Sequence, residues 1–152
     1  MAEDEIGRIA REATQRWPRV NNLNLTQALQ VDFAGLLDGK PEPGIVVIRA
    51  AAAPVILGRG KSVSIRILSP AEAVGEHEVY ELNFAPGGAL VSDPHSPGCR
   101  EHLTVIEGSL RVTSGEDMQD LGMGDTARYA ADRDHAIRAE GAARAILIVQ
   151  DS

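Results

Sequence analysis

Two hydrophobic periodicities divide the chain. Over the first forty residues, apolar positions such as Ile6 and Ile9 recur at helical spacing. From residue 44 onward the period becomes two, which indicates strands with one buried and one exposed face. Prolines and a glycine between these parts cannot continue a helix. The pattern predicts a helical segment at residues 1–39, a linker at 40–44 and a β domain at 45–152.

The amino-terminal pattern favours two or three short helices. Apolar positions continue beyond a break at Pro18. In the last of these helices, Asp32 can cap the first turn and Gly39 can supply the left-handed stop. We therefore expect short helices ahead of the β domain.

The β domain begins with two clear alternating segments. In "SVSIRIL", Val63, Ile65 and Ile67 fall on one face, and "VYELNF" repeats the pattern. Turns rich in Gly, Asp and Pro separate further short segments. The sequence thus predicts an all-β sandwich or barrel, with more strands in "HLTVIEG" (102–108), "LRVTSG" (110–115), "ARYAA" (127–131), "HAIRAEG" (135–141) and "ARAILIVQ" (143–150).

Composition narrows the classes of function. Aromatic residues make up only 3% of the chain, so the core must be built from Val, Ile, Leu and Ala. A formal net charge of -7 disfavours broad attraction to nucleic-acid backbones, which requires clustered Lys and Arg. The most apolar stretch, "GIVVIRAAAAPVILG", is interrupted by Arg49 and Pro54 and is too short to span a bilayer. A single cysteine, Cys99, fits a reducing compartment, so we expect a cytoplasmic protein without a membrane partner.

Candidate chemistry gathers in "DPHSPGCREHLTVIEG", residues 93–108. This stretch holds His95, Cys99, Glu101 and His102 in a chain with four histidines and one cysteine. Strand alternation predicts that His102 points away from Glu101. Only Arg100 could lower the pKa of Cys99, which we interpret as an incidental loop residue.

Other polar side chains are expected at the surface. His77 lies in a polar turn or strand edge. Four arginines alternate with apolar residues and should form a solvated face, although one turned inward could bind a carboxylate; they are Arg66, Arg111, Arg128 and Arg138.

Two segments together resemble the motifs of the cupins, which are small double-stranded β-helix (jelly-roll) barrels. They are "HSPGCREHLTVIEGSLRV" (95–112) and "LGMGDTARYAADRDHAI" (121–137). The resemblance implies a mainly β jelly-roll barrel preceded by the short helices. Aligned on the motif glycines Gly108 and Gly124, it assigns the metal-ligand places to His95, Pro97, Glu101 and His135.

Pro97 leaves the implied metal site incomplete, because its side chain cannot coordinate. His95, Glu101 and His135 could still hold Zn, Fe, Mn or Ni with water or His102 completing the set. Alternatively, Glu101 and His135 hydrogen-bond each other or an organic ligand in the barrel mouth, which the missing histidine favours. In extended chain, residues 95, 97 and 101 would share a face, and the Pro-Gly pair leaves that regularity open.

The amino-terminal segment resembles the second half of the helix-turn-helix domain of XRE-family transcriptional regulators. The matching residues are Arg8, Ile9, Arg11, Pro18, Ala28, Leu29, Val31, Leu36 and Leu37. Many such regulators carry a carboxy-terminal cupin sensor domain. The first helices of the DNA-binding domain have no counterpart here, so DNA becomes a partner only where a complete helix-turn-helix domain is present. Two helices that only pack on the barrel remain the alternative.

The resemblance predicts a cupin domain that senses a small polar metabolite through His95, Glu101 and His135, with no catalytic residue assigned. The alternative functions are a small metal-dependent cupin enzyme, of isomerase or dioxygenase type, and an interaction module with an empty barrel. A homodimer is also expected. Apolar residues predicted on the outer face, Ile106, Ile146 and Ile148, could form its interface or be covered by residues 45–56.

Overall fold

The computed structural model describes residues 44–58 and 62–152. The helical segment predicted at residues 1–39 lies outside these ranges. In the described part, no helix has both the length and the apolar character needed to cross a membrane.

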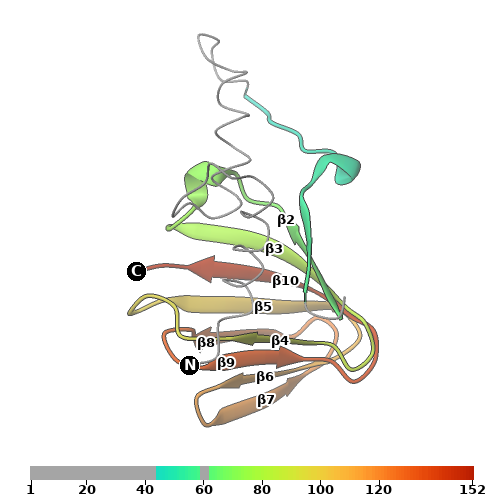
Figure 1. Cartoon of the computed structure of the whole chain (residues 1–152), viewed down its shortest axis with the longest axis vertical. Coiled ribbons are helices and arrows are strands. Elements are labelled where there is room, and N and C mark those ends of the chain that lie inside the picture. Colours follow the sequence, from blue (N-terminus) through green and yellow to red (C-terminus); the bar gives the residue numbers. More distant parts are fainter. Residues whose placement is uncertain (1–43, 59–61) are drawn as a thin grey trace.

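Two antiparallel sheets form the described structure (Figure 1). The larger has the order β1 (Val55–Leu57), β2 (Val63–Ile67), β3 (His77–Phe84), β10 (Ala143–Gln150), β5 (Arg100–Glu107) and β8 (Thr126–Ala130). The smaller has the order β4 (Ala89–Ser92), β9 (His135–Arg138), β6 (Leu110–Ser114) and β7 (Asp117–Leu121). Two short 3-10 turns, η1 (Ala50–Ala52) and η3 (Ala71–Ala73), flank β1 and β3.

Alternating burial along the strands builds the core. Val63, Ile65 and Ile67 of β2 are buried while the residues between them are partly exposed, as the sequence pattern predicted. The eight residues of β10 alternate in the same way. Leu82, Leu103 and other fully buried side chains from different strands meet in one cluster. The prediction of a mainly β fold is therefore confirmed.

The motif glycines occupy turns that require glycine. Gly108, between β5 and β6, has φ +76°, and a Cβ there would lie 2.5 Å from the carbonyl oxygen of Ala142. Gly124 has φ +88° in the turn before β8. Both conformations favour glycine over residues with a side chain. These turns set the entry and exit of strands that carry site residues.

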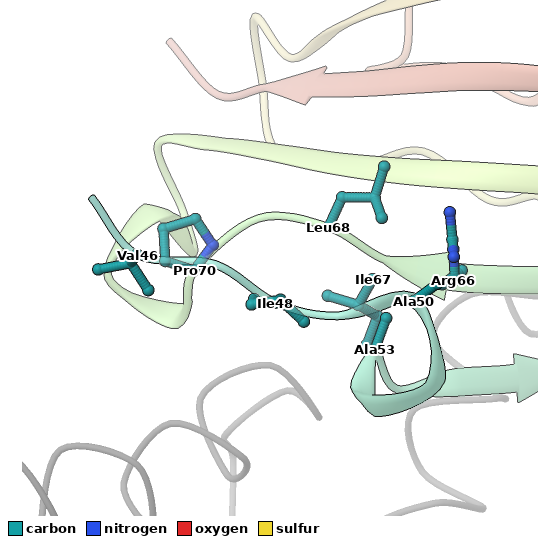
Figure 2. Close-up of a pocket in the computed structure, with 8 residues that line it drawn as sticks. All are labelled: Val46, Ile48, Ala50, Ala53, Arg66, Ile67, Leu68 and Pro70. Atoms are coloured by element: carbon teal, nitrogen blue, oxygen red, sulfur yellow. The ribbon is translucent and has the colours of Figure 1, made fainter.

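The segment 45–56 contains part of the edge strand of the large sheet. β1 lies at the edge of the large sheet, and β2 and β3 separate it from β10. Val46 and Ile48 line a groove beside Leu68 and Pro70, on the same side as β1 (Figure 2). Covering by this segment stays one of the two explanations for Ile146 and Ile148.

Candidate functional site

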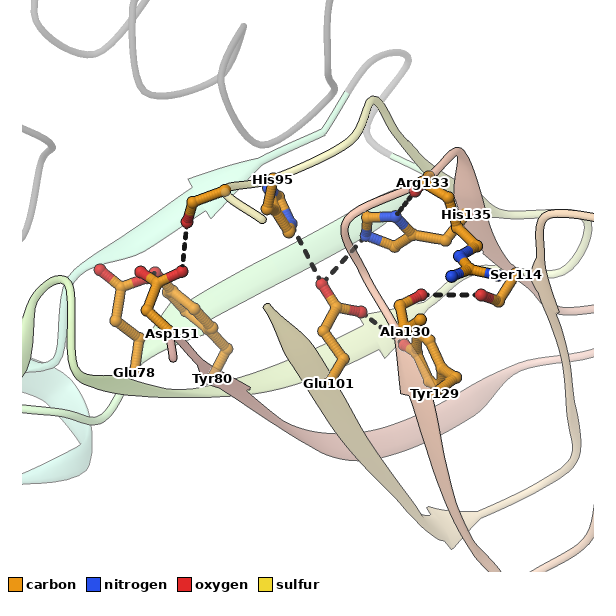
Figure 3. Close-up of polar contacts among 11 residues, drawn as sticks. Glu78, Tyr80, His95, Glu101, Ser114, Tyr129, Ala130, Arg133, His135 and Asp151 are labelled. Atoms are coloured by element: carbon orange, nitrogen blue, oxygen red, sulfur yellow. Dashed lines mark hydrogen bonds and ion pairs between the residues drawn. The ribbon is translucent and has the colours of Figure 1, made fainter. Parts of the chain in front are cut away.

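Glu101 is the centre of a buried polar cluster. It lies on β5 between Val149 of β10 and Tyr129 of β8, and only 1% of it is exposed. Its Oε2 accepts a hydrogen bond of 2.5 Å from the Tyr129 hydroxyl. Its Oε1 faces the imidazoles of His95 and His135, as Figure 3 shows. A buried carboxylate is tolerated here because it has partners on both oxygens.

His135 reaches Glu101 from the other sheet. It begins β9, where its strand neighbours are Ser92 of β4 and Ser114 of β6, and 3% of it is exposed. These small neighbours leave space for the imidazole. Its Nε2 lies 3.1 Å from the Glu101 Oε1.

The tautomer of His135 follows from its other contact. Its Nδ1 lies 2.7 Å from the carbonyl oxygen of Arg133, which can only accept, so Nδ1 carries a proton. In the neutral ring, Nε2 therefore points a lone pair at Glu101. The lone pairs of His135 Nε2 and Glu101 Oε1 would repel each other at this distance. A cation between the two atoms removes the repulsion, and it can be a proton on the ring or a metal ion. Histidines that bind metals commonly donate their second nitrogen to a backbone carbonyl in this way.

His95 forms the open side of the cluster. It lies in the loop before β5, where its backbone N–H donates to the Ala131 carbonyl at 2.8 Å. Its Nε2 lies 3.2 Å from the Glu101 Oε1, and its ring packs edge-on against that of His135 with centroids 4.9 Å apart. The side chain of His95 is 21% exposed, so solvent and solutes can reach the cluster at this residue.

The cluster holds Glu101 ionised. Burial opposes the charge, but hydrogen bonds from His135 and His95, the charge of His135 and the Tyr129 hydroxyl outweigh it, and the pKa of Glu101 falls to about 2. Burial, followed by the charge of Glu101, raises the pKa of Tyr129 well above its ordinary value. Tyr129 therefore acts as a hydrogen-bond donor.

The residue types of the cluster are ones that bind divalent metal ions. The ligand atoms of His95, Glu101 and His135 all lie within 4.8 Å of one another. Bonds of about 2.0 to 2.2 Å at angles of about 90° to 109° would place neighbouring donors roughly 2.8 to 3.6 Å apart. The two N···O separations, 3.1 and 3.2 Å, fall in this range and are also ordinary hydrogen-bond lengths. Either occupant, a proton or a metal ion, is compatible with these two contacts.

Pro97 lies outside the cluster. The chain turns at residues 96–98, where Gly98 has φ +84°, so the extended face considered for residues 95, 97 and 101 does not form. Pro97 is exposed, and its carbonyl accepts a hydrogen bond of 3.0 Å from the Ser152 hydroxyl. Among the described residues, the metal-ligating group consists of three side chains.

The remaining candidates do not contribute side chains to the cluster. His102 alternates with Glu101 on β5 and is partly exposed on the opposite face, and His77 is exposed. Cys99 is buried beside the cluster. Burial, followed by the charge of Asp151, raises the pKa of this thiol to about 12, which makes it a poor nucleophile.

The four arginines lie on the outside, as expected. The guanidinium of Arg66 donates to Glu81 at 2.9 Å, and that of Arg111 donates to Asp120 at 2.6 Å. Arg128 and Arg138 are exposed.

Tyr129 is the member of the cluster that sequence reasoning missed, because its role depends on its pairing with Glu101 across two strands.

Comparison with known proteins assigns the barrel to a family. Residues 80–150 match the Cupin_2 family, described as the cupin domain. This part of the chain is a cupin domain. Both motifs lie within the matched residues. The three clustered side chains, His95, Glu101 and His135, therefore belong to the matched part of the chain.

The cupin domain is similar to parts of transcriptional regulators. It is 36% identical over 64 residues to the HTH-type transcriptional regulator SutR of Escherichia coli strain K12, covering 42% of this chain and 36% of that protein. An HTH_3 family transcriptional regulator from Vibrio cholerae has a similar structure, with 27% identity, a TM-score of 0.56 and coverage of 60% and 52%. The chain thus spans about a third to a half of these relatives.

More distant structures share the fold alone. The Cupin_2 domain of an XRE family transcriptional regulator from Enterobacter cloacae has 24% identity, a TM-score of 0.55 and coverage of 60% of this chain and 98% of that one. The structure of FeII HppE has 16% identity, a TM-score of 0.60 and coverage of 72% and 62%.

Proposed function

We propose that this cupin domain is the sensor part of an XRE-type transcriptional regulator and binds a small polar effector at His95, Glu101 and His135. The observation that carries the proposal is the buried Glu101 carboxylate, which faces two imidazoles at 3.1 and 3.2 Å and is reached from solvent past His95. The similarity to SutR and to the Vibrio cholerae regulator supports the proposal that the domain is part of a transcriptional regulator.

The site is suited to a polar ligand because its groups have opposite hydrogen-bonding roles. Glu101 accepts only, whereas the imidazoles and the Tyr129 hydroxyl can donate. An effector with hydroxyl or carboxylate groups could replace the contacts of His95, the most exposed member. Binding would then move the loop that carries His95 and favour one arrangement of a dimer. DNA binding belongs to a protein with a complete helix-turn-helix domain.

Thermal unfolding with small polar metabolites and divalent metal salts tests this proposal. A ligand of the native state raises the unfolding temperature by mass action, with about 2.7 kcal/mol of stabilisation at a hundredfold excess over Kd. The rise should vanish in His135→Ala and persist in His102→Ala, the matched control on the opposite face of β5. A wild-type protein that no such solute stabilises would overturn the proposal.

A metal-dependent enzyme is the second candidate, favoured by the tautomer of His135. With Nδ1 bound to the Arg133 carbonyl, the Nε2 atoms of His135 and His95 and the Glu101 carboxylate would hold the ion. A bound divalent ion would supply open coordination positions that polarise a substrate. Elemental analysis of the purified protein separates the candidates: stoichiometric Zn, Fe, Mn or Ni that is lost in His135→Ala would favour the enzyme.

A further inference from the structure

The two residues after β10 contact the loop before β5, which carries His95. Gln150 ends β10 and is paired with Arg100, which begins β5. Because the two strands are antiparallel, the chain after Gln150 runs beside the chain before Arg100. Asp151 and Ser152 are therefore placed next to the loop.

Two side-chain hydrogen bonds join these residues to the loop at positions 95–99, which we call the His95 loop. The Ser96 hydroxyl donates to the Asp151 Oδ1 at 2.5 Å. The Ser152 hydroxyl donates to the carbonyl oxygen of Pro97 at 3.0 Å. We call this pair of contacts the latch. The latch holds the loop at two adjacent points.

The close fit of the two segments requires glycine at position 98. Gly98 has φ +84°, and a Cβ there would lie 2.7 Å from the Ser152 hydroxyl oxygen. Any other residue type would strain the backbone and collide with the latch. The Gly98 N–H also donates to the Asp132 Oδ2 at 3.1 Å, which ties the loop to the turn before β9. The shape of the loop is therefore matched to the side chain of Ser152.

The residues of the latch are themselves fixed by β3. The N–H of Asp151 donates to the carbonyl oxygen of Glu76 at 3.0 Å, which extends the ladder between β10 and β3 by one residue. The Asp151 backbone thus belongs to the large sheet while its side chain contacts the His95 loop. Figure 3 shows Asp151 on the side of the cluster where His95 lies, away from Tyr129. The latch therefore fastens the loop to the large sheet.

The His95 loop forms one wall of the polar cluster. His95 Nε2 lies 3.2 Å from the Glu101 Oε1, and Cys99 at the other end of the loop is buried. Both hydrogen bonds of the latch lie at the surface, where water can replace them at a small cost in free energy. The latch can therefore open locally while the barrel stays folded. Opening exposes the cluster and the Cys99 thiol.

We propose that Asp151 and Ser152 are positioning residues that hold His95 in the cluster. With the latch closed, the imidazole faces the carboxylate of Glu101. With the latch open, the loop moves away from these residues and solutes reach the cluster. An effector that contacts His95 enters through the open form and is retained in the closed form. This consequence for binding rests on the proposed function, whereas opening of the latch is measured without a ligand.

Cys99 reports the opening, because it is the single cysteine of the chain. Burial raises the pKa of its thiol to about 12, followed by the charge of Asp151 and a hydrogen bond to it. A buried thiol is modified only from the open form. When the loop closes faster than the reagent reacts, the rate of modification follows the population of the open form.

Modification of Cys99 by a neutral maleimide at a fixed pH tests the latch in the full chain. Ser96→Ala with Ser152→Ala removes both hydrogen bonds and leaves the charges near the thiol unchanged. Loss of one exposed hydrogen bond shifts such an equilibrium about two- to tenfold, so the rate should rise on the order of tenfold. Ser109→Ala, at an exposed serine beyond the other end of β5, should keep the wild-type rate. A rate within about twofold of the wild type in the double variant would overturn the proposal.

Hydrogen exchange of single amides, measured by NMR, shows where the opening occurs. The His95 N–H donates to the Ala131 carbonyl at 2.8 Å, and the Val105 N–H, further along β5, donates to the Asp125 carbonyl at 3.0 Å. The double serine variant should speed exchange at His95 on the order of tenfold and leave exchange at Val105 unchanged. Equal acceleration at both amides would show that the whole barrel opens, which contradicts a local latch.

Rescue by a conservative change tests Asp151. Asp151→Ala removes the acceptor of the Ser96 hydroxyl and should speed exchange at His95 about two- to tenfold. Asp151→Asn keeps a side-chain oxygen that can accept and should exchange as the wild type does. Exchange is the readout here because the charge of Asp151 also acts on the Cys99 thiol. Equal acceleration in both variants would contradict a hydrogen-bonded latch. A protein that no solute stabilises would remove the proposed function and leave these ligand-free results unchanged.

Discussion

The barrel cluster and the apolar edge, which is strand β1 at the border of the large sheet, break the usual division between polar surface and apolar interior in opposite senses. In the cluster, Glu101 and His135 are buried, and both carboxylate oxygens of Glu101 have polar partners. At the edge, Val55 and Leu57 are half exposed, and among the described residues no strand lies beside their outward backbone groups. The barrel cluster has polar groups in the interior, where apolar groups are expected. The apolar edge has apolar groups at the surface, where polar groups are expected.

The two departures indicate different kinds of function. Burial of an ionised group has an unfavourable free energy of desolvation. The hydrogen-bonded partners offset this free energy only while each of them remains in place. Such a site can respond to a ligand that changes one partner. An open apolar edge costs little in the isolated chain but gains free energy when covered. The cluster is thus suited to sensing, and the edge to contact with another apolar surface.

Glu101→Ala should give the largest loss of stability. It leaves the imidazoles of His95 and His135 and the Tyr129 hydroxyl without their shared acceptor. Removal of one partner from a buried charged network costs about 3 to 5 kcal/mol. Urea unfolding measures this loss, and Asp120→Ala, at an exposed ion pair with Arg111, serves as the control with little effect. A loss as small as the control's would show that the cluster does not stabilise the fold.

Acid should remove a comparable part of the stability. The pKa of Glu101 is about 2, below its ordinary value of 4.5, so the folded state binds the proton less readily than the unfolded state. This contribution is present above about pH 4.5 and disappears as the pH falls toward 2. It amounts to about 3 kcal/mol at most. Urea unfolding at a series of pH values should show a shallower acid dependence in Glu101→Gln than in the wild type.

The exposed edge should tolerate truncation far better than the core. Leu57 is 50% exposed, so Leu57→Ala should cost about 1 kcal/mol or less. Leu147→Ala, the same change at a fully buried position of β10, should cost about 2 to 5 kcal/mol. Urea unfolding measures both losses. Equal losses would mean that the edge is packed against other parts of the chain.

Regular alternation made much of the fold predictable. Segments such as "SVSIRIL" and "ARAILIVQ" became β2 and β10 because one face of each enters the core. β7 was not predicted, since its sequence "DMQDL" is exposed at four of five positions and shows no apolar period. β4 was missed because only Leu90 and Ser92 of its four residues are buried.

The cluster was predictable only where a motif fixed the spacing. Alignment on Gly108 and Gly124 selected His95, Glu101 and His135, and the structure brings their side chains together. Their role in ligand binding stays a prediction. Tyr129 could not be selected, because its contact with Glu101 depends on the register of β5 and β8. The free edge of β1 likewise depends on strand order, which alternation along one strand does not reveal.

His102→Ala should have the smallest effect and sharpens the boundary of the cluster. His102 follows Glu101 directly, yet it lies on the other face of β5 beside Ile148 and Arg128 on the neighbouring strands. Its loss removes a partly exposed side chain on the face opposite the Glu101 carboxylate, so the free energy of unfolding should change by about 0.5 kcal/mol or less. Metal and effector binding, measured by calorimetry, should match the wild type. A large loss of binding would place His102 in the site and show that strand alternation fails at this point.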